Sequence, residues 1–140
     1  MLKQITIKHS LTFKKEEKLK SGKLIELLFK KGLSFSNFPF KILYLFTKNN
    51  IAPLQAGFAV STKKFKHAVD RNRIKRLIRE AYRLQKNELT GVLKFHEKFL
   101  IVFFIYTGNE IPEYVDVYEK MQSALIRLNK IVDESPAGNS

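Results

Sequence analysis

Residues 70–83 read DRNRIKRLIREAYR and hold five arginines, one lysine and two carboxylates. At about 100° per residue, the apolar positions gather in one helical stripe about 120° wide: Ile74, Leu77, Ile78, Ala81 and Leu84. The other side collects one polar and six cationic residues: Arg71, Asn72, Lys75, Arg76, Arg79, Arg83 and Lys86. Arg73 lies apart, on the far edge of the apolar stripe. The segment therefore predicts an amphipathic helix over roughly residues 70–88, with one side on a core and a basic face outward.

The basic face carries more charge of one sign than a solvated surface requires. Cations one turn apart, such as Arg71, Lys75 and Arg79, repel one another by about a few tenths of a kcal/mol per pair. A helix selected only for stability would alternate its signs, whereas a face of one sign suits a bound polyanion. Arginine outnumbers lysine here although lysine dominates elsewhere, and guanidinium groups grip phosphates and stack on bases. We therefore expect this face to contact nucleic acid.

Two carboxylates lie inside the basic segment. We expect Asp70 at the start of the helix, where an N-cap position and the helix dipole favour it. Glu80 is spaced to pair with Arg76 or Arg83. The two carboxylates lie about 280° apart around the helix and cannot converge on one metal ion. The sequence predicts no catalytic residue and no metal site in this chain.

The composition indicates one folded domain with a polyanion partner. The chain has 140 residues, of which 44% are hydrophobic, and a net charge of +13. Residues 63–86 carry ten Lys and Arg against two carboxylates, whereas residues 87–140 carry five against eight. This uneven distribution favours nucleic acid over a membrane surface. The sequence contains no cysteine, no signal-peptide pattern and no apolar run of about 20 residues, so we expect a cytoplasmic protein.

The pattern before the basic helix predicts an arm, a helix and strands. Residues 1–20 are expected to form a basic, extended arm. The segment SGKLIELLFKKG predicts a helix with Ser21 as its N-cap and Gly32 as its C-terminal stop. Segments rich in β-forming residues predict strands over residues 33–36, 40–47 and 54–62.

After the basic helix we expect a loop around Thr90 and Gly91, an apolar strand over residues 98–107 and a last helix that starts after Pro112. The order α-β-β-β-α-β-α predicts an α+β two-layer sandwich. One domain over residues 1–132 and a disordered tail over residues 133–140 complete the prediction.

Basic and aromatic residues outside the helix extend the predicted surface. Lys63, Lys64 and Lys66 lead into the basic helix. Most of the twelve phenylalanines belong in the core, but an aromatic ring beside a basic groove can stack on an unpaired base. The residues placed for stacking are Phe29, Tyr44 and Tyr82.

The segment DRNRIKRLIREAYR closely resembles the RNR signature of the bacterial ribonuclease P protein family. The surrounding order is similar too: a helix ending in LFKKG, a strand, GFAVSTKKFKHAV, the basic helix, an apolar strand and a last helix. The resemblance covers roughly residues 11–130 and is strongest to the Bacteroidetes branch. It implies a ribosomal-protein-like fold in which strand, basic helix and strand form a left-handed βαβ crossover.

By resemblance, the chain is an accessory subunit that binds a catalytic RNA and the 5′ leader of precursor tRNA. The RNA, with Mg²⁺ that it holds itself, removes the leader by endonucleolytic hydrolysis. The chain would then need no cofactor, membrane or obligate protein partner. The expected RNA-binding residues are Lys63, Lys64, Lys66, Arg71, Asn72, Arg73, Lys75, Arg76, Arg79 and Arg83. The expected leader cleft lies between the sheet and the basic helix, with Phe29, Tyr44 and Tyr82 as its aromatic residues.

Three alternatives share some of these features. A ribosomal protein or another RNA-binding module would have the same charge and fold class but would not support cleavage of precursor tRNA. A DNA-binding regulator would need a short helix before the basic one, where the sequence predicts a strand. An autonomous nuclease would cleave RNA without an RNA subunit.

Overall fold

The computed structural model describes residues 11–48 and 50–136, so the first half of the predicted arm lies outside the described residues. The elements in chain order are η1 (Lys15–Glu17), α2 (Gly22–Lys31), β1 (Leu33–Asn37), β2 (Phe40–Thr47), β3 (Leu54–Val60), α3 (Ala68–Gln85), α4 (Asn87–Phe95), β4 (Phe99–Tyr106) and α5 (Tyr114–Glu134). Within these residues, no helix combines the length and the apolar character needed to cross a bilayer.

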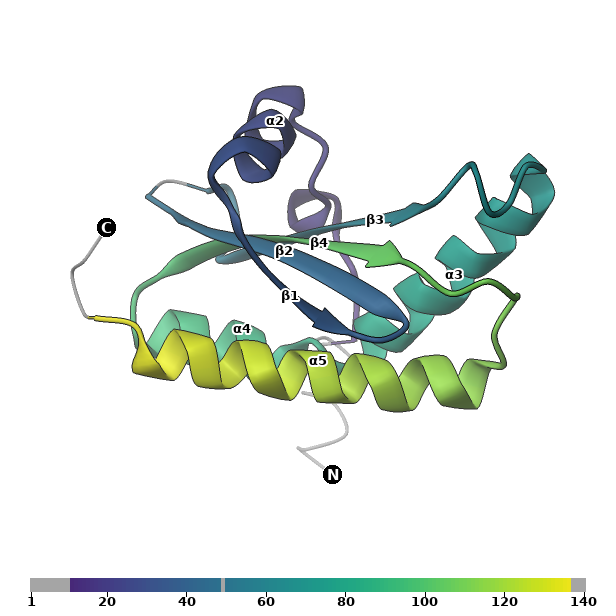
Figure 1. The fold of residues 1–140 in the computed structure, drawn as a ribbon. Helices are drawn as coiled ribbons and strands as arrows, with labels where there is room; N and C mark the ends of the chain where they lie inside the picture. The colour runs from purple at the N-terminus through teal and green to yellow at the C-terminus, as the bar shows by residue number, and fades with distance from the viewer. Residues whose placement is uncertain (1–10, 49, 137–140) are drawn as a thin grey trace.

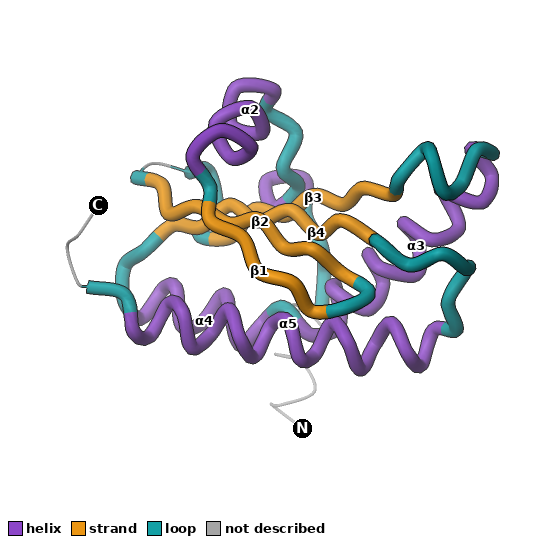
Figure 2. The backbone as a smooth tube through the Cα atoms, in the orientation of Figure 1, coloured by secondary structure: helices purple, strands orange, loops and turns teal. Residues whose placement is uncertain are grey.

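The four strands form one sheet in the order β1-β2-β4-β3 (Figure 2). β4 is antiparallel to β2 and parallel to β3. The connection from β3 to β4 passes through α3 and α4 beneath the sheet and is left-handed (Figure 1). This hand is rare, since about 98% of such connections are right-handed. The sheet order and the path of this connection confirm the predicted α+β class and its left-handed crossover.

The sheet separates two apolar layers. Leu100, Val102 and Phe104 of β4 face the larger layer, which α3, α4 and α5 cover (Figure 1). Ile101 and Phe103 alternate with them and face α2 on the other side. Because successive side chains of a strand point to opposite faces, the continuous apolar run of β4 serves both layers.

The apolar stripe of α3 packs on the sheet as its spacing predicts. Ile74, Ile78 and Ala81 are completely buried. The helix begins at Ala68, two residues earlier than expected, so Asp70 lies in the first turn and is not the N-cap. There it still interacts favourably with the helix dipole.

The predicted loop around Thr90 and Gly91 is wrong, because these residues lie within α4. Leu89 and Leu93, on the inner side of α4, are completely buried. Glycine costs a helix about 1 kcal/mol, whereas burial of each leucine contributes roughly 1.5–3 kcal/mol. Tertiary packing therefore outweighs the weak local helix preference.

The predicted arm is folded onto the domain from residue 11 onward. We call residues 11–20 the N-terminal strap. It passes from the α3 side of the sheet, along the edge of β3, to α2 above (Figure 1). The Leu19 amide donates to the Ala56 carbonyl of β3 at 2.9 Å, and the Gln55 side chain donates to the Glu16 carbonyl at 2.9 Å. The strap thus covers the outer edge of β3, which would otherwise expose unpaired backbone groups.

A buried ion pair fastens the strap to the end of α3. Lys86, predicted on the basic face, is only 4% exposed, and its Nζ lies 2.7 Å from Glu17 Oε1. Removing one partner of a buried pair leaves the other charge poorly compensated.

We expect Glu17→Gln to lower the free energy of unfolding by about 2 kcal/mol, as measured by urea denaturation. The substitution keeps the size of the side chain but removes the charge that faces Lys86. Glu16→Gln is the matched control, since this neighbouring carboxylate is exposed and in no ion pair among the described residues. Equal stability of the two variants would contradict this role.

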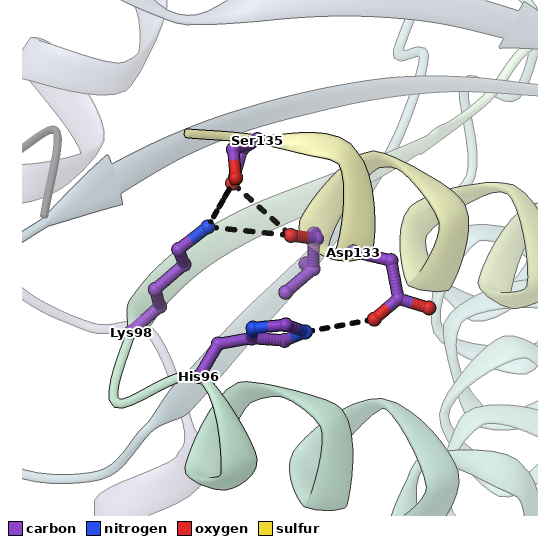
Figure 3. Close-up of polar contacts among 5 residues, drawn as sticks. His96, Lys98, Asp133 and Ser135 are labelled. Carbon is purple, nitrogen blue, oxygen red and sulfur yellow. Dashed lines mark hydrogen bonds and ion pairs between the residues drawn. The ribbon is translucent and has the colours of Figure 1, made fainter. Parts of the chain in front are cut away.

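The end of α5 is tied to the start of β4 (Figure 3). Lys98 Nζ donates to the carbonyls of Val132 at 3.3 Å and Ser135 at 2.9 Å, and also to the Ser135 hydroxyl. His96 Nε2 lies 2.8 Å from Asp133 Oδ1. A cation at the last carbonyls stabilises a helix C-terminus. The predicted tail over residues 133–140 therefore begins too early, because α5 runs to Glu134; residues 137–140 of the predicted tail lie outside the described residues.

Candidate nucleic-acid interface

The outward face of α3 carries most of the predicted RNA-binding side chains. Asn72, Arg73, Arg76 and Arg79 are exposed, and Lys75 is half-buried. Among the described residues, none of these side chains takes part in an ion pair. The buried stripe on the opposite side fixes the helix on the sheet. The face therefore presents positive charge that is not neutralised within the described protein.

The segment between β3 and α3 adds three exposed lysines, Lys63, Lys64 and Lys66. Arg71, predicted to bind RNA, is half-buried, and its Nη1 donates at 2.8 Å to the carbonyls of both Phe65 and Lys66. Lys64 Nζ donates at 2.6 Å to the carbonyl of Thr107, beyond β4. Arg71 thus holds the shape of the lysine-bearing segment.

Arg83 is held by two partners. It forms a bidentate pair with Glu80, with Nε–Oε1 at 3.1 Å and Nη2–Oε2 at 2.6 Å, which confirms that predicted pairing. Its Nη1 donates to the Leu11 carbonyl of the strap at 2.8 Å. The hydrogen bond from Arg83 lowers the pKa of Glu80, and the bond to Glu80 raises the pKa of Arg83. Arg83 is therefore a partly compensated cation that joins α3 to the strap.

A basic notch lies where the strap meets α3. It is a cavity of about 270 Å³ lined by Phe13, Lys18, Arg76, Arg79, Glu80 and Arg83. Lys18 was not among the predicted site residues. The sequence gives only a lysine-rich arm there, and the pairing of Lys18 with Ala56 on β3 brings it beside α3.

The sheet face beside α2 carries an aromatic pair. Phe29 of α2 is 54% exposed, and its ring centre lies 5.6 Å from that of Phe103 on β4 in an edge-to-face arrangement. A Cβ atom at Gly57 would come within 2.4 Å of the Phe103 ring, so glycine allows this ring to lie against β3. Phe103 was missed by sequence reasoning because it lies in an unbroken apolar run in which no position stands out.

The predicted cleft between the sheet and the basic helix is wrong, because core side chains fill that space, and the three predicted aromatic residues do not share one open face. Tyr44 lies on the opposite face of the sheet from Phe103 and Phe29, in the layer covered by the long helices, beside Phe35. Tyr82 is completely buried, so it offers no ring to a base. Phe13 of the strap covers Tyr82 at a ring-centre distance of 5.5 Å, and Phe58 and Phe104 contact it as well.

The acidic and histidine side chains are scattered. Asp70 lies in the first turn of α3, whereas Glu80 lies ten residues further along and on another side of the helix. Within the described part of the chain, no group of three or more His, Cys, Asp or Glu side chains could hold a metal ion.

Comparison with known proteins shows the family to which this chain belongs. The family model described as Ribonuclease P matches residues 13–129. The chain belongs to the ribonuclease P protein family. The ribonuclease P protein component of Porphyromonas gingivalis W83 is 35% identical over 126 residues, covering 89% of this chain and 92% of that protein. The corresponding protein of Clostridium botulinum Langeland is 34% identical over 117 residues, covering 83% and 94%.

Solved structures of the ribonuclease P protein family agree with the fold. The protein from Thermotoga maritima is 29% identical, with a TM-score of 0.61, covering 79% of this chain and 96% of that chain. The protein from Staphylococcus aureus, at 24% identity and a TM-score of 0.58, shares the fold and covers 84% and 99%.

Membership in the ribonuclease P protein family confirms the resemblance carried by residues 70–83. It gives the chain the role of a protein subunit of ribonuclease P. We call seven cationic residues and Asn72 on α3 and the preceding segment the RNR surface: Lys63, Lys64, Lys66, Asn72, Arg73, Lys75, Arg76 and Arg79.

Proposed function

We propose that this subunit binds the catalytic RNA of ribonuclease P through the RNR surface and the 5′ leader of precursor tRNA through the face beside α2. The observation that carries the proposal is the set of cations on α3 that have no ion-pair partner among the described residues. Membership in the ribonuclease P protein family supports a ribonuclease P RNA as the partner.

Charge gives the subunit its physical role. The catalytic RNA and the precursor tRNA are both polyanions and repel each other, and a protein of net charge +13 lowers that repulsion. If about six phosphates are neutralised, the logarithm of the binding constant falls with the logarithm of salt concentration at a slope near −4 for a single strand.

The chemistry belongs to the RNA in this proposal. Mg²⁺ held by the RNA would activate the attacking water and stabilise the leaving oxygen. The chain positions the RNA and the substrate, and its exposed guanidinium groups screen their phosphates. It supplies no proton-transfer group to the reaction.

The leader is single-stranded, so its contacts should combine backbone charge with stacking and carry little sequence specificity. The exposed ring of Phe29, braced by Phe103, offers a stacking surface. The affinities of the reconstituted complex for precursor tRNA and for mature tRNA test this. Equal affinities would contradict leader binding.

We expect Phe29→Ala to weaken binding of precursor tRNA about tenfold and to leave binding of mature tRNA unchanged, because one stacked base contributes roughly 1–3 kcal/mol. Equilibrium binding to the complex of protein and catalytic RNA measures both affinities. Phe95→Ala is the matched control, since Phe95 is 82% exposed on α4, away from α2. A loss of the same size for both tRNAs would show that Phe29 supports the complex itself.

A further inference from the structure

The guanidinium group of Arg71, the first arginine of the RNR signature, binds the protein's own backbone. The side chain is half-buried, and its Nη1 donates at 2.8 Å to the carbonyl of Phe65 and, at the same distance, to that of Lys66. Both N–H groups of this nitrogen therefore have a protein acceptor. Arg76 and Arg79, on the same helix, are exposed instead. The arginines of α3 thus fall into two kinds.

The segment that this arginine binds is a turn between β3 and α3. The Phe65 amide donates to the Ser61 carbonyl at 3.1 Å, which closes the turn. The Phe65 ring is only 7% exposed, and its centre lies 6.1 Å from that of Tyr106 at the end of β4. On either side of this buried ring, Lys63 and Lys66 are exposed. The core anchors the middle of the turn, and the guanidinium group holds the part that leads into α3.

The path of the turn decides where these lysines lie. A cation on a helix is placed by the helix, whereas Lys63 and Lys66 follow a turn whose backbone loses conformational freedom when it is ordered. Lys64, between them, has an anchor of its own, since its ammonium group donates to the Thr107 carbonyl. Arg71 orders the turn before RNA arrives. Its charge also compensates the partial negative charge of two carbonyls beside a phosphate-binding surface.

We infer that Arg71 is a positioning residue for RNA binding, which acts through Lys63 and Lys66 and makes no phosphate contact of its own. The inference rests on the proposed RNA-binding function. It gives the first arginine of the signature a different role from Arg76 and Arg79, which bind RNA directly. Arg71→Ala should weaken binding of ribonuclease P RNA about tenfold, because the two lysines lose their common geometry.

A double-mutant cycle between Arg71 and the two lysines tests this, with equilibrium binding of the full chain to a bacterial ribonuclease P RNA as the readout. Once Lys63 and Lys66 are both alanine, Arg71→Ala should weaken binding by less than about twofold, since it has nothing left to position. Arg79→Ala, about 12 Å further along the helix, is the matched control and should cause the same loss in both backgrounds. A tenfold loss from Arg71→Ala in both backgrounds would overturn the inference and make Arg71 a phosphate contact. No binding by the native chain would instead overturn the proposed function itself.

Arg71→Lys separates reach from charge. Lysine keeps the charge, but its shorter side chain should not hold both carbonyls, so RNA binding should stay about tenfold weaker than in the native chain. In the free ¹⁵N-labelled variant, the ¹H–¹⁵N NOE values of residues 63–66 should fall as the turn becomes mobile, while those of β2 and β4 stay the same. Native RNA affinity of Arg71→Lys, or unchanged NOE values in the turn, would overturn the inference. Loss of the folded spectrum in both Arg71 variants would overturn it too, because Arg71 would then serve the fold as a whole.

Discussion

The double substitution of Arg76 and Arg79 by alanine is expected to weaken binding of ribonuclease P RNA about 30-fold at low ionic strength. Both guanidinium groups are exposed, line the same notch and have no ion-pair partner among the described residues. Each substitution removes one charge-assisted contact with a phosphate. A loss of about 1 kcal/mol per contact, for two contacts, corresponds to the roughly 30-fold weaker binding. The free energy of unfolding should stay the same, because neither side chain packs in the core.

Equilibrium binding at several salt concentrations measures this effect. The slope of the logarithm of affinity against the logarithm of salt should fall in magnitude by about 1.5, since two phosphate contacts are lost. Lys94→Ala combined with Lys130→Ala removes the same charge from exposed positions on α4 and α5 and serves as the control. Equal losses in the two double variants would mean that only net charge attracts the RNA, and a loss of stability would mean that the face of α3 was wrongly assigned.

Tyr82→Ala is expected to lower the free energy of unfolding by about 4 kcal/mol, a large share of the roughly 5–15 kcal/mol typical of a domain. The ring is completely buried between the strap and the sheet, with Phe13, Phe58 and Phe104 around it. The alanine variant loses this packing and leaves a cavity. Urea denaturation of the isolated protein measures the change.

Tyr82→Phe separates the ring from its hydroxyl. The hydroxyl has no hydrogen-bond partner among the described residues, so its removal should cost nothing and should stabilise the fold by up to about 1 kcal/mol.

Burial, and to a lesser extent the Glu17 carboxylate, raises the pKa of Tyr82 well above its ordinary value of 10.0. The folded state therefore keeps the proton that the unfolded state loses above that value, so stability should fall as the pH rises past 10.0 in the native protein. This component should be absent from Tyr82→Phe, and a destabilised Tyr82→Phe at neutral pH would contradict the buried, unpaired hydroxyl.

Local patterns were enough to predict the elements that bury their own apolar stripe. The stripe of α3 and the strands at residues 40–47 and 99–106 follow directly from the spacing of Ile, Leu and Phe. α4 was missed because Thr90 and Gly91 have weak helix propensity, and the helix is stabilised by contacts that spacing does not reveal.

The errors at the site have one cause, which is contact between segments far apart in the sequence. The strap reads as a lysine-rich arm, yet it buries Tyr82 through Phe13 and Lys86 through Glu17. Tyr82 and Lys86 lie toward the polar side of α3, so the spacing of residues along the helix alone cannot predict their burial. Tyr44 was misplaced because the loose alternation of β2 did not fix which face each side chain takes; its pairing with Val102 of β4 does.

Reconstituted cleavage tests the central claim most directly. The full chain is combined with a bacterial ribonuclease P RNA and a 5′-labelled precursor tRNA at Mg²⁺ concentrations where the RNA alone reacts slowly. The proposal predicts cleavage at the mature 5′ end that needs both components and is reduced by the Arg76 and Arg79 double substitution. Cleavage that the protein does not accelerate with a cognate RNA, or cleavage by the protein without RNA, would contradict it.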